Sequence, residues 1–259
     1  ITGQGVNVAI IDQPLLLGHK EYKDKVVKYT VIDCEGVEPQ MHGPAVASIL
    51  VGKDCGVAPG ASLYYWAEPS WKGDYKYRTT ALNQIIEYNK NKPLKKKIRV
   101  VSVSKGFSTD EDNLSMWKEK IKEAEENGII IVHCSDEGDE RFSGIGCKLY
   151  EDRDNPKNYD LCYFANNKSF RKPINSKYVP IDNRTTADYT GENDYAFWAD
   201  GGLSWGAPYL AGVIALGFQV NPNLEEKEIY QYLRETGTPF NGGFIVNPKA
   251  FIKKVNELE

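Results

Sequence analysis

Three residues of the types that cooperate in nucleophilic catalysis are spread along the chain: Asp12, His42 and Ser204. A serine hydroxyl is a weak nucleophile and needs an adjacent base to remove its proton, which an imidazole supplies. A carboxylate bonded to the imidazole fixes its tautomer and stabilises the imidazolium that forms. If the fold brings these side chains together, they predict covalent catalysis at a carbonyl carbon.

Each of the three stands at the end of an element that can position it. Residues 6–11, apolar except for Asn7, form a run typical of a strand covered on both faces, and Asp12 closes this run. α/β sheets bind ligands at the carboxyl ends of their parallel strands. His42 and Ser204 each precede an apolar segment rich in small residues, which predicts a buried helix. Backbone N–H groups at a helix start stabilise negative charge nearby.

Each residue also has an ordinary structural interpretation. An aspartate after a strand is commonly a turn or capping residue, and a serine before a helix commonly caps it. A single histidine before a helix is more often a cap or a core residue than a catalyst. The order Asp, His, Ser is nevertheless one of the chain orders in which a catalytic triad is built.

The remaining pattern alternates buried strands with helices. Further strand-forming runs occupy residues 26–31, 61–66, 98–104, 129–135 and 242–247. Helical spacing occupies residues 77–88, 112–127, 222–233 and a closing segment through Val255. This alternation predicts an α/β protein whose parallel sheet is covered by helices on both faces. Residues 144–191 are expected to form irregular strands and surface loops without a domain boundary, so that residues 1–259 form one domain.

Four motifs at these positions resemble those of the subtilisin-like serine proteases, the subtilases of peptidase family S8. The matching segments are Val8–Asp12 for the family's aspartate strand, His42–Ala47 for His-Gly-Thr-His-Val-Ala, Gly202–Pro208 for Gly-Thr-Ser-Met-Ala-Thr-Pro and Gly56–Pro59 for Gly-Val-Ala-Pro. The resemblance extends from about residue 6 to residue 255, except for residues 144–191. An α/β-hydrolase esterase does not fit, because its order is Ser, acid, His and its Gly-x-Ser-x-Gly motif is absent.

The resemblance implies a three-layer α/β sandwich with a mainly parallel sheet, and a serine endopeptidase that works through an acyl-enzyme intermediate. Asp12, His42 and Ser204 take the positions of the family's catalytic triad. In the family, the oxyanion is held by the backbone N–H of the serine and by an Asn side chain in a segment resembling Ala-Gly-Asn-Glu-Gly. The matching segment is 134–138, which puts Asp136 in the place of that Asn.

Asp136 leaves two interpretations of the function open. An ionised carboxylate only accepts hydrogen bonds and repels an oxyanion, whereas a protonated one can donate. Loss of one oxyanion donor lowers turnover by about 10²–10³-fold. The alternative to an endopeptidase is a catalytically weak or inactive pseudoprotease that serves as a peptide-binding or regulatory module. The complete triad favours the enzyme, because a peptide-binding module has no need of all three residues.

The resemblance also implies a groove for the substrate. In the family, an extended peptide adds as a strand beside the segment that matches Ser104, Lys105 and Gly106. A side-chain pocket lies between that segment and the one matching His133, Cys134 and Ser135. Lys105 would place a cation at the pocket edge, where it would favour acidic or polar side chains of the substrate. The alternative is an ordinary solvated amine.

The composition of the chain limits the classes of partner that it is expected to bind. A formal net charge of −4 argues against nucleic acid as the main partner. No apolar run is expected to reach the roughly 18 residues of a membrane span, so no membrane partner is predicted. The expected partners are a peptide or protein substrate and a propeptide or inhibitor. The spacing of Cys and His predicts no metal site and no cofactor, and structural calcium stays open as an alternative because it cannot be read from this sequence.

The cysteine content bears on the redox setting. Five cysteines are an odd number, and their irregular spacing matches no disulfide framework. Free thiols are therefore expected, with a Cys147–Cys162 bridge as the alternative. Together with the lack of a signal peptide at Ile1, free thiols favour an intracellular or otherwise reducing setting.

Overall fold

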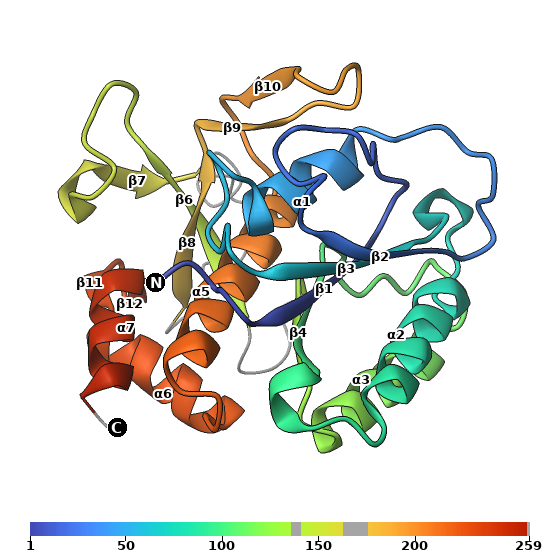
Figure 1. Cartoon of the computed structure of the whole chain (residues 1–259). Helices are drawn as coiled ribbons and strands as arrows, with labels where there is room; N and C mark the ends of the chain where they lie inside the picture. The colour runs from blue at the N-terminus through green and yellow to red at the C-terminus, as the bar shows by residue number, and fades with distance from the viewer. Residues whose placement is uncertain (136–140, 163–175, 258–259) are drawn as a thin grey trace.

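A computed structural model of the chain describes residues 1–135, 141–162 and 176–257. Its centre is a five-stranded sheet in the order β2-β3-β1-β4-β5 (Figure 1), and all four pairs of neighbouring strands are parallel. The strands are β1 (Asn7–Asp12), β2 (Val26–Val31), β3 (Ser62–Ala67), β4 (Ile98–Val103) and β5 (Ile130–His133). Their carboxyl ends therefore meet at one edge of the sheet, where ligands of α/β proteins bind.

The alternation of side chains along β1 explains why its central residues, Val8 to Ile11, are all apolar. Val8 and Ile10 belong to a core cluster that includes helices α1 (His42–Val51) and α5 (Gly206–Val220). Ala9 and Ile11 belong to a second cluster on the opposite face, with α2 (Lys76–Asn89) and α3 (Leu114–Glu126). Because successive side chains of a strand point to opposite faces, a strand between two helical layers is apolar at every position. The predicted three-layer α/β sandwich is confirmed.

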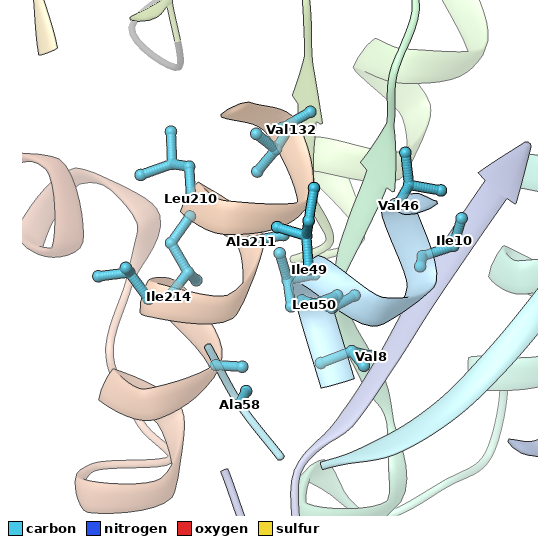
Figure 2. Close-up of a cluster of buried hydrophobic side chains, with 14 of the residues drawn as sticks. Val8, Ile10, Val46, Ile49, Leu50, Ala58, Val132, Leu210, Ala211 and Ile214 are labelled. Atoms are coloured by element: carbon cyan, nitrogen blue, oxygen red, sulfur yellow. The ribbon is translucent and has the colours of Figure 1, made fainter. Parts of the chain in front are cut away.

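Helices α1 and α5 lie side by side against the same face of the sheet (Figures 1 and 2). Figure 2 shows Ile49 and Leu50 of α1 beside Ala211 of α5, with Val8 of β1 next to Leu50. Both helices are buried along almost their whole length, as their small and apolar composition predicts. His42 is the first residue of α1, and Ser204 lies just before α5. The packing of the two helices therefore brings the two predicted catalytic segments together.

A second sheet, in the order β11-β12-β8-β6-β7, contains the part of the chain where only irregular strands were predicted. β6 (Phe142–Cys147) and β8 (Lys177–Asp182) pair in parallel, and every residue of β8 is buried. β8 carries a lysine, a proline and an aspartate, which hide its buried character from a hydrophobicity pattern. The lysine is accommodated because the ammonium of Lys177 lies over the ring of Tyr230 at 4.4 Å.

The remaining elements are mostly those of the C-terminal half. They are β7 (Tyr159–Leu161), β9 (Arg184–Ala187), β10 (Tyr195–Trp198), β11 (Thr238–Phe240), β12 (Gly243–Ile245), α6 (Glu226–Thr236), α7 (Pro248–Asn256) and the short 3₁₀ turns η1 (Ser70–Lys72), η2 (Leu94–Lys96), η3 (Pro156–Asn158) and η4 (Leu203–Trp205). Helix α6 begins four residues later than predicted, because Glu225 and Glu228 form a reciprocal capping box that fixes its start.

One helical segment is long and apolar enough to test the expectation about membrane spans. By length and composition, Leu203–Val220 is apolar enough to cross a membrane, so the prediction that no run reaches that length was wrong. This segment is η4 continued by α5, and 72% of it is buried inside the protein, as in a core helix.

Cys147 is a free thiol, as are Cys34, Cys55 and Cys134, which excludes the Cys147–Cys162 bridge.

Candidate active site

The structure brings Asp12 and His42 into direct contact. Asp12 is the last residue of β1 and His42 is the first residue of α1. His42 Nδ1 lies 2.6 Å from Asp12 Oδ1, and Asp12 is only 6% exposed. An ionised carboxylate accepts hydrogen bonds and cannot donate them, so this contact places the imidazole proton on Nδ1. His42 Nε2 is then the atom that can accept a proton from a nucleophile.

Gly43 allows the start of α1 to approach the end of β1. A Cβ atom at this position would lie 2.6 Å from the carbonyl oxygen of Gln13 and 2.8 Å from that of Pro14. Real Cβ atoms do not approach backbone oxygens so closely, so only glycine fits without a shift of the helix. The contact between His42 and Asp12 thus depends on the residue that follows His42.

Replacing Gly43 by alanine is expected to destabilise the fold by about 1–3 kcal/mol, because the added methyl group must push α1 away from β1. Helix propensity alone predicts the opposite change in stability, because alanine is favoured over glycine inside a helix. Thermal or urea denaturation measures the change. Gly202→Ala is the matched control, since its Cβ has no atom nearer than the 3.9 Å of Ser204 N beyond its chain neighbours. A Gly43→Ala variant more stable than the wild type would contradict the expectation.

Ser204 lies in η4, the 3₁₀ turn that leads into α5. Its hydroxyl donates to the backbone carbonyl of Ser104 at 3.3 Å, and the Ser104 hydroxyl donates to the carbonyl of Ser204 at 2.8 Å. The expected hydrogen bond between Ser204 and His42 is not formed within the described part of the chain. The 3.3 Å bond is long for an O–H donor, and it holds the serine side chain toward β4. Catalytic hydrogen bonds commonly tighten only when substrate binds.

Trp205, the residue after Ser204, connects the serine turn to the imidazole. Its ring is 5.3 Å from the ring of His42 and 5.4 Å from the ring of Trp198 of β10. Trp205 is nearly fully buried, so the indole restricts the orientations open to the imidazole. The sequence showed that the family's methionine is replaced by tryptophan here but did not show that the indole reaches the histidine.

The electrostatics at His42 favour the protonated imidazole. Burial by itself lowers the pKa of His42, but the charge of Asp12 and the hydrogen bond to it, together with the charge of Glu68, raise it above the ordinary value. A raised pKa means that the imidazole takes up a proton more readily than a free histidine does. The site is therefore arranged to stabilise the imidazolium that forms when a nucleophile loses its proton.

The two segments expected to form the substrate groove lie side by side beyond β4 and β5. The N–H of Cys134 donates to the carbonyl of Lys105 at 3.1 Å, and a Cβ at Gly106 would lie 3.1 Å from the carbonyl of Cys134. The side chains of His133 and Ser135 are buried and bonded to each other, with 2.7 Å between His133 Nδ1 and Ser135 Oγ. A peptide in this groove would therefore meet their backbone rather than these two side chains.

Lys105 is not the isolated cation that the sequence suggested. Its ammonium forms an ion pair with Glu111, and Glu111 also lies 3.7 Å from the guanidinium of Arg78. The charge of Lys105 is thus already compensated within the protein. The expectation that it attracts acidic substrate side chains loses its physical basis.

A cavity of about 190 Å³ lies beside the catalytic candidates. Its charged and polar lining includes Asp12, His42, Glu68, Arg78, Ser104 and Lys105. The sequence prediction did not include Glu68 or Arg78. Glu68 could have been found, because it follows a buried strand in the same way as Asp12 does. Arg78 has no local signal, since a single arginine in a helix is ordinarily on the surface.

The second predicted oxyanion residue, Asp136, lies outside the described residues. No group of three or more His, Cys, Asp or Glu side chains within residues 1–135, 141–162 and 176–257 is placed to hold a metal ion.

Comparison with known proteins identifies a matching family and fold. A sequence profile of the subtilase family matches residues 3–169, which is well over half of the chain. Among solved structures, the subtilase cytotoxin SubAB assembly is similar with 15% identity and a TM-score of 0.74, over 98% of this chain and 91% of that one. The PatG macrocyclase in complex with peptide is similar with 14% identity and a TM-score of 0.69, over 97% of this chain and 92% of that one. Fervidolysin from Fervidobacterium pennivorans, a keratinolytic enzyme related to subtilisin, is similar with 16% identity and a TM-score of 0.69, over 97% of this chain and 43% of that one. At these identities the likeness shows a shared subtilisin-like fold.

Proposed function

Because the chain belongs to the subtilase family, whose members are serine proteases, we propose that it is a serine endopeptidase with Ser204 as nucleophile, His42 as base and Asp12 as the residue that orients the base. The observation that carries the proposal is the 2.6 Å contact between His42 Nδ1 and Asp12 Oδ1. This contact leaves Nε2 as the proton acceptor, which is the protonation state that general-base catalysis requires.

The proposed reaction has two halves. Ser204 Oγ attacks the scissile carbonyl carbon while its proton passes to His42 Nε2, and the carbonyl oxygen becomes an oxyanion. The imidazolium then gives this proton to the leaving amine, the C–N bond breaks and an acyl-enzyme remains. Water repeats the sequence, losing a proton to His42, and Ser204 leaves as an alcohol with that proton restored.

For the first step, the Ser204 hydroxyl must exchange its hydrogen bond with the Ser104 carbonyl for one with His42. The present bond is 3.3 Å long and therefore weak, so the exchange costs little. A peptide that adds as a strand beside residues 104–106 would itself need the backbone groups of that segment. Substrate binding would in this way favour the productive orientation of the serine.

The oxyanion would be held by the backbone N–H of Ser204, at the turn that leads into α5. Asp136 stands at the position of the second donor in the sequence. If Asp136 is ionised, the endopeptidase is slow and approaches the pseudoprotease alternative. If burial keeps it protonated, Asp136 donates to the oxyanion as an amide would.

Replacing Asp136 by asparagine is expected to raise turnover at neutral pH by about 10²-fold if the wild-type carboxylate is ionised, because a repelling acceptor becomes a donor. If it is protonated, the wild type is already active and loses activity as the pH rises through the elevated pKa. Turnover of a peptide panel between pH 5 and 9 distinguishes the two states. Asp160→Asn, at an exposed position in β7, is the control for the same chemical change.

A fluorophosphonate probe tests the proposed nucleophile directly. Intact mass spectrometry is expected to show one adduct on the wild type and none on Ser204→Ala, and mapping of the digested protein is expected to place the adduct on the peptide that contains Ser204. If neither protein is labelled, and the wild type and Asp136→Asn both turn over peptides no faster than Ser204→Ala at every pH, the endopeptidase proposal fails. The pseudoprotease then remains.

The proposed substrate is a peptide or protein bound in extended form along residues 104–106 and 133–135. The similarity to a macrocyclase solved with a peptide supports this class of substrate. A propeptide or inhibitor would occupy the same groove. Among substrate side chains, acidic ones are not expected to be preferred through Lys105, because Glu111 compensates its charge.

A further inference from the structure

Glu68 is a second carboxylate beside the His42–Asp12 pair. β1 and β3 are neighbouring parallel strands, and Asp12 pairs with Ala67 at their carboxyl ends. The N–H of the next residue, Glu68, donates to the carbonyl of Asp12 at 2.8 Å. Glu68 is 2% exposed and lines the cavity that also contains His42. Two strand ends thus place two acidic side chains at the same buried site.

The charge of Glu68 is matched by a buried arginine. Arg78 Nη2 of α2 donates to Glu68 Oε1 at 2.6 Å, and both side chains are 2% exposed. Among the described residues, Glu68 Oε2 and the Nε and Nη1 atoms of Arg78 have no hydrogen-bond partner. A buried ion pair with incomplete hydrogen bonding adds little to stability, because desolvation offsets the attraction. Fold stability alone therefore gives little reason for this pair.

We propose that Glu68 is a positioning residue for His42: its carboxylate, kept ionised by Arg78, is a second negative charge that stabilises the imidazolium formed when His42 takes a proton. The inference deepens the proposed function, since it rests on His42 as the base. Glu68 does not touch the reacting atoms and acts through the field at the imidazole.

The other groups around His42 leave room for this effect. Asp12 faces the imidazole from β1, and Lys105 approaches from the end of β4 with its charge compensated by Glu111. Cys134, beyond β5, stays a neutral thiol, because burial and the charge of Asp12 raise its pKa. Trp205 contributes an uncharged ring. Glu68 is therefore the one further anion that acts on His42 within the described part of the chain, and it raises the pKa of His42 in the same direction as Asp12 does.

Arg78 determines whether Glu68 carries its charge. The pKa of the Glu68 carboxyl is raised above its ordinary value, mainly by burial and in part by the charge of Asp12, while the charge of Arg78, the hydrogen bond from Arg78 and the charge of Lys105 limit this rise. Removal of Arg78 is therefore expected to act on His42 through Glu68, which would take up a proton and become neutral.

The test is the pKa of the His42 imidazole, measured by NMR in a Ser204→Ala background so that no turnover is needed. The chain has only three histidines, and His19 and His133 are both buried, which makes assignment through a His42→Gln variant direct. Glu68→Gln is expected to lower the pKa of His42 by roughly half to one pH unit, since it removes one nearby negative charge. Arg78→Met is expected to lower it by a similar amount.

Control variants distinguish the electrostatic effect of Glu68 on His42 from a general loss of folding. Glu87→Gln removes one negative charge from the exposed surface of α2 and is expected to leave the pKa of His42 unchanged. The double variant Glu68→Gln/Arg78→Met leaves no unpaired buried charge, so it is expected to fold even if a single variant does not. It should show the same downward shift. An unchanged or raised pKa of His42 in folded Glu68→Gln or in the folded double variant overturns the inference.

The same variants distinguish this inference from the proposed function. With Ser204 restored, the acid limb of kcat/KM for Glu68→Gln is expected to move to lower pH by the shift seen in NMR. An NMR shift in a protein without turnover would retain the electrostatic role of Glu68 and reject the endopeptidase. Turnover by the wild type without a shift of the His42 pKa in Glu68→Gln would reject the electrostatic role of Glu68 and retain the endopeptidase.

Discussion

The Ser204→Ala variant is expected to hydrolyse peptides about 10⁶-fold more slowly than the wild type in kcat, with little change in KM. The hydroxyl is the proposed nucleophile, so its removal eliminates the acyl-enzyme route. The groove formed by residues 104–106 and 133–135 remains to bind substrate. His42→Ala is expected to cost about as much, and the double variant hardly more, because the two residues act as one unit.

The rate measurement needs a long incubation and product detection by mass spectrometry, because the residual rate approaches that of the uncatalysed reaction. Ser115→Ala, at an exposed position on α3, is the control for the same chemical change. It is expected to keep the wild-type rate. Retention of more than about 1% of the wild-type rate by Ser204→Ala would reject Ser204 as the nucleophile, since a triad serine contributes far more.

Much of the layered fold could be predicted from the sequence because its signals are local. β1 lies between two helical layers, so its central positions, Val8 to Ile11, are all apolar and the strand is visible in sequence. The small residues of α1 and α5 likewise mark helices buried on most faces. The order of Asp12, His42 and Ser204 at the ends of these elements then predicted the site, and of its expected contacts the structure shows the one between Asp12 and His42.

The parts that could not be predicted depend on partners far away in the sequence. β8 is buried although it begins with Lys177, because the ring of Tyr230 receives the ammonium. Lys105 was expected to be an open cation, but the ion pair with Glu111 is formed by a loop with no recognisable pattern. The contact of Trp205 with His42 requires α1 and α5 to be packed together first. Such pairings arise from the assembled fold and leave no periodicity in the sequence.

Asp12→Asn is expected to lower kcat by about 10⁴-fold while leaving the fold intact. In the wild type, Asp12 Oδ1 receives hydrogen bonds from His42 Nδ1 at 2.6 Å and from the N–H of Gln13 at 2.8 Å. Because both bonds go to one oxygen, an asparagine can keep both of them through its carbonyl oxygen, but it has no negative charge to stabilise the imidazolium. If the amide instead turns its NH₂ group toward His42, the imidazole carries its proton on Nε2, and that atom then cannot accept the proton of Ser204. The loss is therefore one of charge or protonation state rather than of packing.

Two measurements on Asp12→Asn distinguish this mechanism from a structural defect. The thermal midpoint is expected to stay close to that of the wild type, since asparagine and aspartate have nearly the same shape. The pKa of His42 is expected to fall, because the charge of Asp12 and its hydrogen bond raise that pKa in the wild type. Asp33→Asn, an exposed change just beyond β2, is expected to alter neither kcat nor the pKa of His42. A fully active Asp12→Asn variant would show that the buried contact at the end of β1 serves only to hold α1 in place.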